Sequence, residues 1–447
     1  MAKRRKATRR TRKRNSLAHY AAASLLTFAV VYLIILPLIP NNRLPLISNP
    51  SYPIHPIARN TQTPTMITSV ALTISPSSGS ATTTWSSRST ATTGSTGSPT
   101  YTVSQSGPDT IATPASGSGL STYSGTTPET IINDAIAALP SSGGSISIGA
   151  GTYTFTTTPI NLGGGNYAAI GSTNQSNVEI YGQDNSTILA AGTNLNAAIL
   201  GGLDVNNWNI HDLAINGNMA VQSDSGSSPP YLWGIVLYGS SNDLIEHVYF
   251  HDCKTYGAQI GRGNNDNVLY SQFGHNGGNG LLMYGVTNSL IEGNTVNGAS
   301  DVGLDASGAG STYANNVTVT GNWVYNVNLG LSPWGLNTGI GIMTGDDGPA
   351  ENIQITNNYV QGAKVGIDSD ASPDTNTNIL ISGNTIESTR YAALYLVSTS
   401  GVTVKNNTFY ICSDETVVYE SGVTGYSSSG NTTINSCSTA TTTTQMS

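Results

Sequence analysis

The residues best suited to chemistry lie between positions 301 and 395, where acidic side chains recur beside two of the few basic ones. Asp305 and Asp368 occupy the same position of a repeated phrase. A pair of carboxylates is what acid–base cleavage of a glycosidic bond requires. Lys364 and Arg390 lie in the same stretch, and a base beside a positive group can abstract a proton next to a uronate carboxylate. These four residues are therefore the catalytic candidates.

The same stretch holds residues suited to binding a ligand or a metal. Aromatic faces and an amide that could contact sugar rings are offered by Trp334, Asn337, Tyr391 and Tyr395. Ca²⁺ prefers several carboxylate oxygens, and such oxygens are offered by Asp301, Asp346, Asp347 and Asp370 beside the catalytic pair. Calcium is thus the one cofactor that the sequence suggests. The alternative is that these residues are ordinary turn formers on a solvated acidic face.

A repeat organises the elements that must position these residues. The repeat glycines Gly234, Gly257, Gly280 and Gly303 are 23 residues apart. A fixed period in this range indicates one structural unit stacked on itself, and each unit here contains short alternating strands without a helix. The repeat therefore predicts an all-β fold, a parallel β-helix. A column of corner asparagines, suited to the left-handed backbone conformation and to stacking on one another, is formed by Asn294, Asn322, Asn358, Asn384 and Asn407.

Position within the repeat predicts which side chains face outward. The residue after each repeat glycine should point into the core and the next one out, which places Asp305 and Asp368 outward. The two acids are two coils apart, or about 10 Å at roughly 4.8 Å per coil. This separation is compatible with an inverting glycosidase, whose carboxylates lie about 6.5–9.5 Å apart. In the same coils the repeat lengthens to steps of 36, 27 and 27 residues, and insertions on one side of a repeat protein favour a binding face.

A helix predicted over Thr127–Leu139 precedes the first coil and is placed to cap the open end of the solenoid. This helix and the following Gly143–Tyr153 resemble the opening of the pectate-lyase superfamily, and Asn378–Ile386 resembles its β-helix repeats. The resemblance implies a right-handed β-helix, in agreement with the crossover rule. It implies no single activity, because lyases, hydrolases, epimerases and adhesins share these repeats. The acid, His-Gly and Arg/Lys set of polygalacturonases and the Asp-Pro-His-Asp motif of alginate epimerases are both incomplete here.

The N-terminal sequence predicts a membrane anchor. Nine of the 17 basic residues lie in residues 3–14, and beyond them 8 basic residues face 25 acidic ones, a net charge of −17. An acidic body argues against nucleic acid as a partner. The uncharged run that follows is long enough to span a bilayer with its basic end in the cytoplasm. The predicted segments are a basic cytoplasmic tail (1–19), a transmembrane anchor (20–39), a Ser/Thr/Pro-rich stalk (40–122), the β-helix (123–437) and a disordered tail (438–447).

These features predict a single-pass protein of the cell membrane with its C-terminal domain outside, rather than one secreted after signal cleavage. Five glycosylation-type triplets suit that location. Cys412 and Cys437 are 25 residues apart, close to one coil, and could form a disulfide or remain thiols. Two functions follow. One is a carbohydrate-active enzyme, a polysaccharide lyase or an inverting glycoside hydrolase. The other is a non-catalytic adhesin, glycan-binding or envelope protein. The oligomeric state is not predicted.

Overall fold

The computed structural model describes residues 98–435 except 159, 164–165, 224–231, 311, 328–336, 343–347, 388 and 412–415. The predicted cytoplasmic tail, anchor, most of the stalk and the C-terminal tail lie outside these residues, as do Cys412 and Cys437. Within the described part of the chain, no helix is long and apolar enough to cross a membrane.

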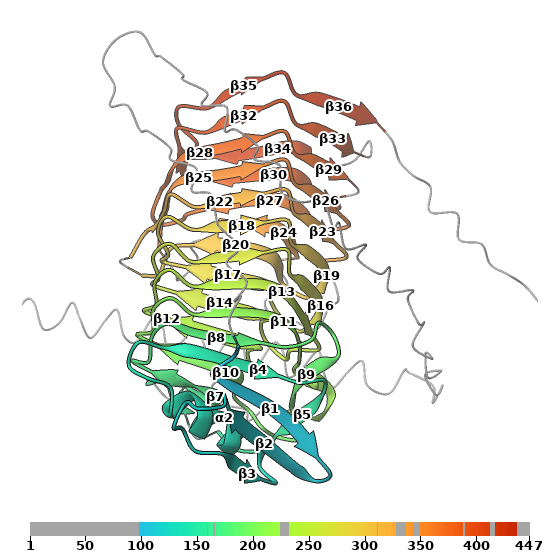
Figure 1. The fold of residues 1–447 in the computed structure, drawn as a ribbon. Helices are drawn as coiled ribbons and strands as arrows, with labels where there is room; N and C mark the ends of the chain where they lie inside the picture. The colour runs from blue at the N-terminus through green and yellow to red at the C-terminus, as the bar shows by residue number, and fades with distance from the viewer. Residues whose placement is uncertain are drawn as a thin grey trace, which may run out of the picture. The chain divides into compact units, whose positions relative to one another are not determined.

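The described chain is a parallel β-helix with two sheets, as Figure 1 shows. Each coil contributes one strand to the 11-stranded sheet, which we call the groove sheet because it carries the surface described below. Its members are β6 (Ile160–Asn161), β7 (Tyr167–Thr173), β10 (Ala198–Leu203), β12 (Ile235–Tyr238), β14 (Ala258–Gly261), β17 (Leu281–Tyr284), β20 (Val302–Ser307), β24 (Thr338–Gly341), β27 (Val365–Asp370), β30 (Ala392–Val397) and β34 (Thr416–Ser421). Only β6 runs antiparallel to its neighbour.

The second sheet has 25 strands and forms the rest of each coil. Its first members are β1 (Tyr101–Ser106), β2 (Asp109–Pro114), β3 (Tyr123–Gly125), β4 (Gly144–Ile148), β5 (Gly151–Phe155), β8 (Val178–Tyr181), β9 (Thr187–Ala191), β11 (Asn209–Asn216) and β13 (Leu244–His251). The middle coils add β15 (Asn267–Leu269), β16 (Gln272–Asn276), β18 (Leu290–Glu292), β19 (Thr295–Ala299), β21 (Ala314–Asn315), β22 (Thr318–Thr320), β23 (Trp323–Tyr325), β25 (Ala350–Thr356) and β26 (Tyr359–Gln361). The last coils add β28 (Asn376–Ser382), β29 (Thr385–Glu387), β31 (Thr399–Ser400), β32 (Thr403–Lys405), β33 (Thr408–Ile411), β35 (Ser427–Ser429) and β36 (Thr432–Asn435).

The predicted capping helix is confirmed as α2 (Pro128–Ala137), followed later in the chain by a short 3-10 turn, η2 (Met219–Val221). The helix buries Ile131, Ile132 and Ile136 in the core that the coils share. Burying apolar surface stabilises the end of the solenoid, which would otherwise expose an apolar interior. Thr127 is the N-cap by position, but its side chain makes no capping hydrogen bond.

The boundary expected at residue 123 is wrong in one respect. Strands β1 and β2 lie within the predicted stalk, and β1 pairs in parallel with β4, adding a rung below the first coil. Tyr101 and Val103 of β1 are fully buried. Their alternation Tyr-Thr-Val is a strand pattern, and the surrounding Ser, Thr and Gly residues hid it. The ordered domain therefore begins before residue 101.

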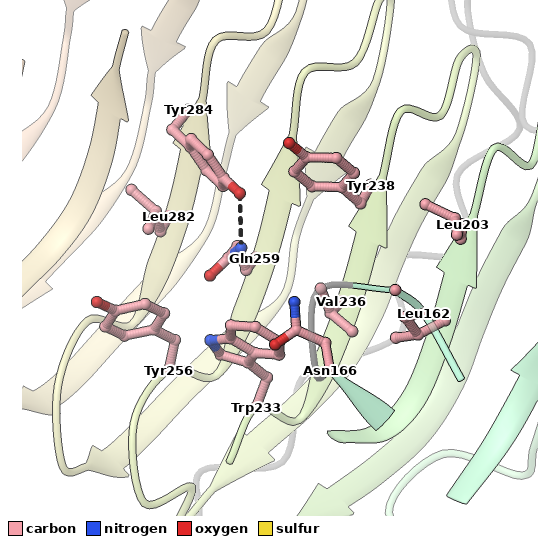
Figure 2. Close-up of a pocket in the computed structure, with 11 residues that line it drawn as sticks. Leu162, Asn166, Leu203, Trp233, Val236, Tyr238, Tyr256, Gln259, Leu282 and Tyr284 are labelled. Carbon is pink, nitrogen blue, oxygen red and sulfur yellow. Dashed lines mark hydrogen bonds between the residues drawn. The ribbon is translucent and has the colours of Figure 1, made fainter. Parts of the chain in front are cut away.

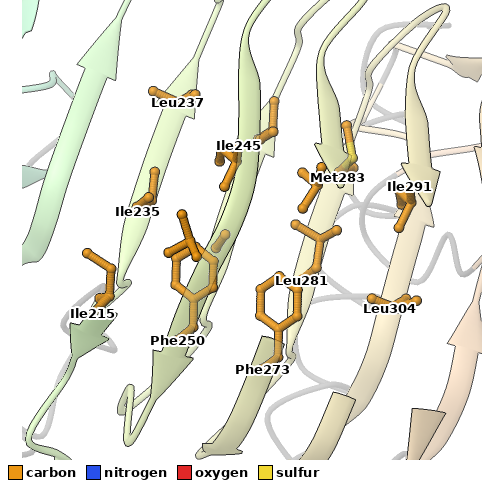
Figure 3. Packing of buried hydrophobic residues seen from close by; sticks show 14 of the residues in the cluster. Ile215, Ile235, Leu237, Ile245, Phe250, Phe273, Leu281, Met283, Ile291 and Leu304 are labelled. Atoms are coloured by element: carbon orange, nitrogen blue, oxygen red, sulfur yellow. The ribbon is translucent and has the colours of Figure 1, made fainter. Parts of the chain in front are cut away.

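The core confirms the predicted inward positions. Ile235, Leu237, Leu281, Met283 and Leu304 are buried, each stacked on its equivalent in the next coil (Figure 3). Phe250 and Phe273 stack with ring centroids 4.8 Å apart. Because each coil buries its apolar residues only against its neighbours, the regular repeat is what holds the scaffold rigid.

The predicted asparagine column exists, with one correction. Asn384 accepts a hydrogen bond from the backbone N–H of Asn358 at 2.9 Å and donates its Nδ2 to the Ile355 carbonyl at 2.8 Å; Asn294, Asn322, Asn358 and Asn407 repeat this arrangement. These residues are not the left-handed ones. Positive φ values occur one residue earlier, as at Gly293, Asn357 and Asn406. The stacked asparagines satisfy buried backbone groups, while their predecessors make the bend.

Candidate functional site

One column of outward side chains crosses the groove sheet from coil to coil. The strand register places in this column, in order, Val236, Gln259, Leu282, Asp305, Gly341, Asp368, Tyr395 and Tyr419. Asp305 and Asp368 are therefore two coils apart, as their repeat position predicted, with Gly341 between them. Because glycine has no side chain, the space between the two carboxylates on the strand surface is not filled by the intervening column residue.

Asp305 is held by hydrogen-bond donors on two sides. The residue is 5% exposed, and its Oδ2 accepts a hydrogen bond from the Asn279 amide at 3.3 Å. Its Oδ1 accepts a hydrogen bond from the Ser307 hydroxyl on the same strand. Donors directed at a carboxylate favour its ionised form. Asp305 is thus buried, and each of its two oxygens receives a donor.

Asp368 has a contrasting environment. It is 7% exposed, and its Oδ2 accepts one hydrogen bond, 3.4 Å long, from the Thr338 hydroxyl. Its Oδ1 is buried with no hydrogen-bond partner in the described part of the chain. Burial, and then the charge of Asp370, raises the pKa of Asp368 to about 7, while Thr338 and Lys364 lower it. Asp368 is thus arranged to hold a proton near neutral pH.

The partners Asn279 and Thr338 were missed by the repeat analysis. Both stand directly before the repeat glycine, a position that strand alternation would turn inward. In the structure each side chain instead reaches the carboxylate of the following coil in the outward column. The sequence signal that could have found them is their polarity, because neighbouring coils have the apolar residues Val302 and Val365 at the same position.

The residues two places before the repeat glycine also form a column. Backbone hydrogen bonds run from Thr338 to Asp301, from Val365 to Asn337 and from Ala392 to Lys364, which stacks Asp301, Asn337, Lys364 and Tyr391. Lys364 and Arg390 are exposed, whereas Asp301 is buried.

Asp301, Asp305 and Asp368 are each less than a tenth exposed. The alternative of a solvated acidic face does not hold for these three residues.

Three tyrosines form a platform next to Asp368. Tyr395 and Tyr419 stack with centroids 4.7 Å apart and planes 6° apart, and the Tyr391 ring lies 6.0 and 6.2 Å from them. Burial, then the charge of Asp370, raises the pKa of the Tyr395 phenol. Tyr391 and Tyr395 were predicted as ligand contacts. Tyr419 was not, although it follows Tyr395 by 24 residues in the same column.

The calcium prediction is incomplete in the structure. Asp346 and Asp347, like the predicted sugar contact Trp334, lie outside the described residues. Among the residues that are described, no three His, Cys, Asp or Glu side chains are grouped as a metal site would require. Asp370 accepts a hydrogen bond from the Ser372 backbone N–H at 3.0 Å. The four-aspartate calcium site stays a prediction.

A cavity of about 590 Å³ occupies the N-terminal half of the groove sheet (Figure 2). It is lined by Leu162, Gly163, Asn166, Leu203, Trp233, Val236, Tyr238, Tyr256, Gln259, Leu282 and Tyr284. Leu162, Trp233 and Val236 belong to a small apolar cluster separate from the main core. Repeat position predicted that Val236, Gln259 and Leu282 face outward. That they line a cavity was not predicted.

The histidines of the described chain lie elsewhere. On the larger sheet, Asp212 contacts its neighbour His211 and also His247 of the following coil. Asp252 contacts its neighbour His251 and also His275 of the following coil. His275 has a positive φ, as a residue in a turn does. None of these four histidines belongs to the groove sheet.

The fold and the register of the outward column define a solenoid of one known family. The family described as "right handed beta helix region" matches residues 115–377, which is more than half of the chain. The chain belongs to this family. The match confirms the predicted right-handed β-helix. No curated protein matches the chain.

Solved structures share the fold at low sequence identity. A mutant tailspike protein of E. coli bacteriophage HK620 in complex with a pentasaccharide is 15% identical with a TM-score of 0.53, over 69% of this chain and 59% of that one. The Azotobacter vinelandii mannuronan C-5 epimerase AlgE6 A-module is 17% identical with a TM-score of 0.46, over 69% and 92%. A Thermotoga maritima exopolygalacturonase is 10% identical with a TM-score of 0.47, over 68% and 87%. The chain thus spans about three fifths of the tailspike protein.

Proposed function

We propose that the groove sheet binds a polysaccharide and hydrolyses it with inversion, with Asp368 as general acid and Asp305 as general base. The observation that carries this proposal is the contrast between two buried carboxylates on one column. Asp368 has a pKa raised to about 7. Asp305 receives two hydrogen bonds that favour its anion. Paired carboxylates whose surroundings differ in this way are suited to opposite roles in acid–base catalysis.

In the proposed reaction, neutral Asp368 gives its proton to the glycosidic oxygen as the bond to the anomeric carbon breaks. Asp305 takes a proton from a water molecule, whose oxygen attacks the same carbon from the opposite side. Two coils separate the acids by about 10 Å between Cα atoms, which leaves room for that water. Exchange of the protons with solvent returns Asp368 to its acid form and Asp305 to its anion.

The surroundings of the pair support this assignment. The tyrosine platform of Tyr391, Tyr395 and Tyr419 lies at the next strands and offers an aromatic surface to a sugar. Asn337 lies in the same column as Tyr391, with Lys364 between them, and offers a further polar contact. Lys364 and Arg390 would serve an acidic sugar at this end. In the lyase alternative, one of them would instead abstract the proton.

The experiment is incubation of the full chain with a panel of neutral and acidic polysaccharides, with and without a chelator. New reducing ends without ultraviolet-absorbing products support hydrolysis. Unsaturated products that absorb in the ultraviolet would instead support the lyase. Binding without turnover would support the second candidate, a non-catalytic glycan-binding surface protein. The predicted anchor at residues 20–39 would hold either protein at the cell surface.

A further inference from the structure

We propose that the cavity lined by Trp233, Tyr256 and Tyr284 is a separate subsite for an uncharged sugar unit with an apolar face. The inference rests on the proposed function in that the ligand is a glycan, but it does not require that the acid pair be catalytic. It narrows the substrate to a chain that contains at least one neutral unit at a fixed distance from Asp305.

The size and walls of the cavity suit a small ligand such as a sugar unit with its substituents. Its volume of about 590 Å³ lies within the range of roughly 300–1,000 Å³ found for small-molecule sites. Trp233 and Tyr256 stand side by side on neighbouring coils and form the aromatic wall (Figure 2). Val236 and Leu162 supply an aliphatic floor. An aromatic wall and an aliphatic floor favour a ligand with an apolar face.

The floor is built by a local feature of the first coils. Leu162, which directly follows β6, packs against the groove sheet at Gly201. A Cβ at Gly201 would lie 2.6 Å from the end of the Leu162 side chain and 2.7 Å from the Ala168 Cβ, so a larger residue there would displace its neighbours. The cavity is thus a specific construction at one end of the groove sheet.

The polar groups of the cavity are uncharged. Gln259 donates its Nε2 to the Tyr284 hydroxyl at 3.2 Å, which leaves its amide oxygen on the cavity side as an acceptor (Figure 2). Asn166 contributes a second amide. No Asp, Glu, Lys or Arg is among the described lining residues. The Arg262 guanidinium lies 5.5 Å from the Tyr238 ring centroid but does not line the cavity. A uronate carboxylate would lose its hydration here without gaining a cation, which disfavours a charged sugar.

Position links the cavity to the acid pair. Gln259 and Asp305 belong to the same outward column, two coils apart, or about 10 Å. Leu282 stands between them and lines the cavity. A glycan that occupies both places must therefore run parallel to the solenoid axis. A single sugar is too short to reach both, so the preferred ligand is an oligosaccharide.

The test is isothermal titration of the full chain carrying Asp305→Asn, which prevents turnover, with two sets of tetrasaccharides. The neutral set is chitotetraose, cellotetraose and mannotetraose, and the charged set is tetragalacturonate and tetramannuronate. We expect at least one neutral ligand to bind more tightly than both charged ones. Adding Tyr256→Ala should raise its Kd about tenfold or more, because a central aromatic contact is lost. Tyr284→Phe should weaken binding less.

The matched control is Trp323→Ala. Trp323 is 59% exposed, and its ring packs 5.2 Å from Tyr359 on the larger sheet, so it offers a rival aromatic platform. Its loss should leave the Kd unchanged. The inference is overturned if no neutral ligand binds, if Tyr256→Ala weakens the uronates more than the neutral ligand, or if Tyr256→Ala has no larger effect than Trp323→Ala. If the wild-type chain cleaves none of these glycans but Tyr256→Ala still weakens neutral binding, the proposed catalysis is refuted and the subsite is supported.

Discussion

Asp243 and Asp266 are two fully buried carboxyl groups stacked in successive coils, and replacing Asp243 by asparagine should stabilise the protein at neutral pH. Asp243 Oδ1 accepts a hydrogen bond from the Trp208 backbone N–H at 2.7 Å, and Asp266 Oδ1 accepts one from the Asp243 N–H at 3.0 Å. The arrangement is the same as in the asparagine column, with aspartates in place of asparagines. Asparagine keeps the acceptor, adds a donor and carries no charge, so Asp243→Asn fits the same position.

The magnitude follows from the pKa of the buried acid. Burial, and then the charge of Asp266, raises the pKa of Asp243 from 3.8 to about 8, although the Trp208 N–H and the Ser240 hydroxyl lower it. The folded chain therefore retains a proton that the unfolded chain releases near pH 4. This contribution to stability is complete below pH 4 and is lost as the pH rises toward 8. At about 1.4 kcal/mol per unit, the loss between pH 4 and pH 7 is at most about 4 kcal/mol.

Thermal unfolding followed by circular dichroism at pH 4, 5.5, 7 and 8.5 measures this effect. The variant should match the wild type at pH 4 and unfold about 5 °C higher at pH 7, given the unfolding entropy of a domain of this size. Asp184→Asn makes the same charge change at an exposed position. It should leave the change in unfolding temperature between pH 4 and pH 7 as it is in the wild type. A stability difference for Asp243→Asn that is the same at every pH would refute the reasoning.

Three further outcomes are expected. Thr338→Val removes a hydrogen bond that lowers the pKa of Asp368, so the alkaline limb of the kcat profile should move up by about half a pH unit; a downward shift would exclude Asp368 as the acid. Asn384→Ala should cost about 2–4 kcal/mol in denaturant unfolding because it leaves buried backbone groups unpaired, whereas Asn297→Ala, which loses an exposed bond, should cost under about 1 kcal/mol; equal costs would contradict the stacking role. Titration with CaCl₂ should show binding that Asp370→Asn weakens about tenfold, and the absence of any heat would remove the predicted calcium site.

Much of the fold was predictable because every coil of the repeat must bury its apolar residues in the same way. Each coil must bury Ile235, Leu281 or their equivalents against its neighbours, and only one register satisfies all coils at once. The capping helix was predictable for a similar reason, since its apolar stripe is local in sequence. Strand β1 was not, because its pairing with β4 is non-local and its surroundings are composed like a linker.

The candidate site was predictable only along the strands. Repeat position placed Asp305 and Asp368 on one column, because alternation along a strand fixes the direction of a side chain. Asn279 and Thr338 hold a position that alternation predicts to face inward, so their contacts with the acids could not be predicted from the repeat. The cavity depends on Leu162 from a distant turn, which no periodicity of the coil reports.

The roles of Asp368 and Asp305 are tested most directly by the anomeric configuration of the first product, read by ¹H NMR during cleavage of a polysaccharide by the full chain. Inversion is expected, at a rate that Asp368→Asn lowers by about 10²–10⁴-fold. Retention of configuration would contradict the account, because a covalent intermediate requires carboxyl groups only about 5 Å apart.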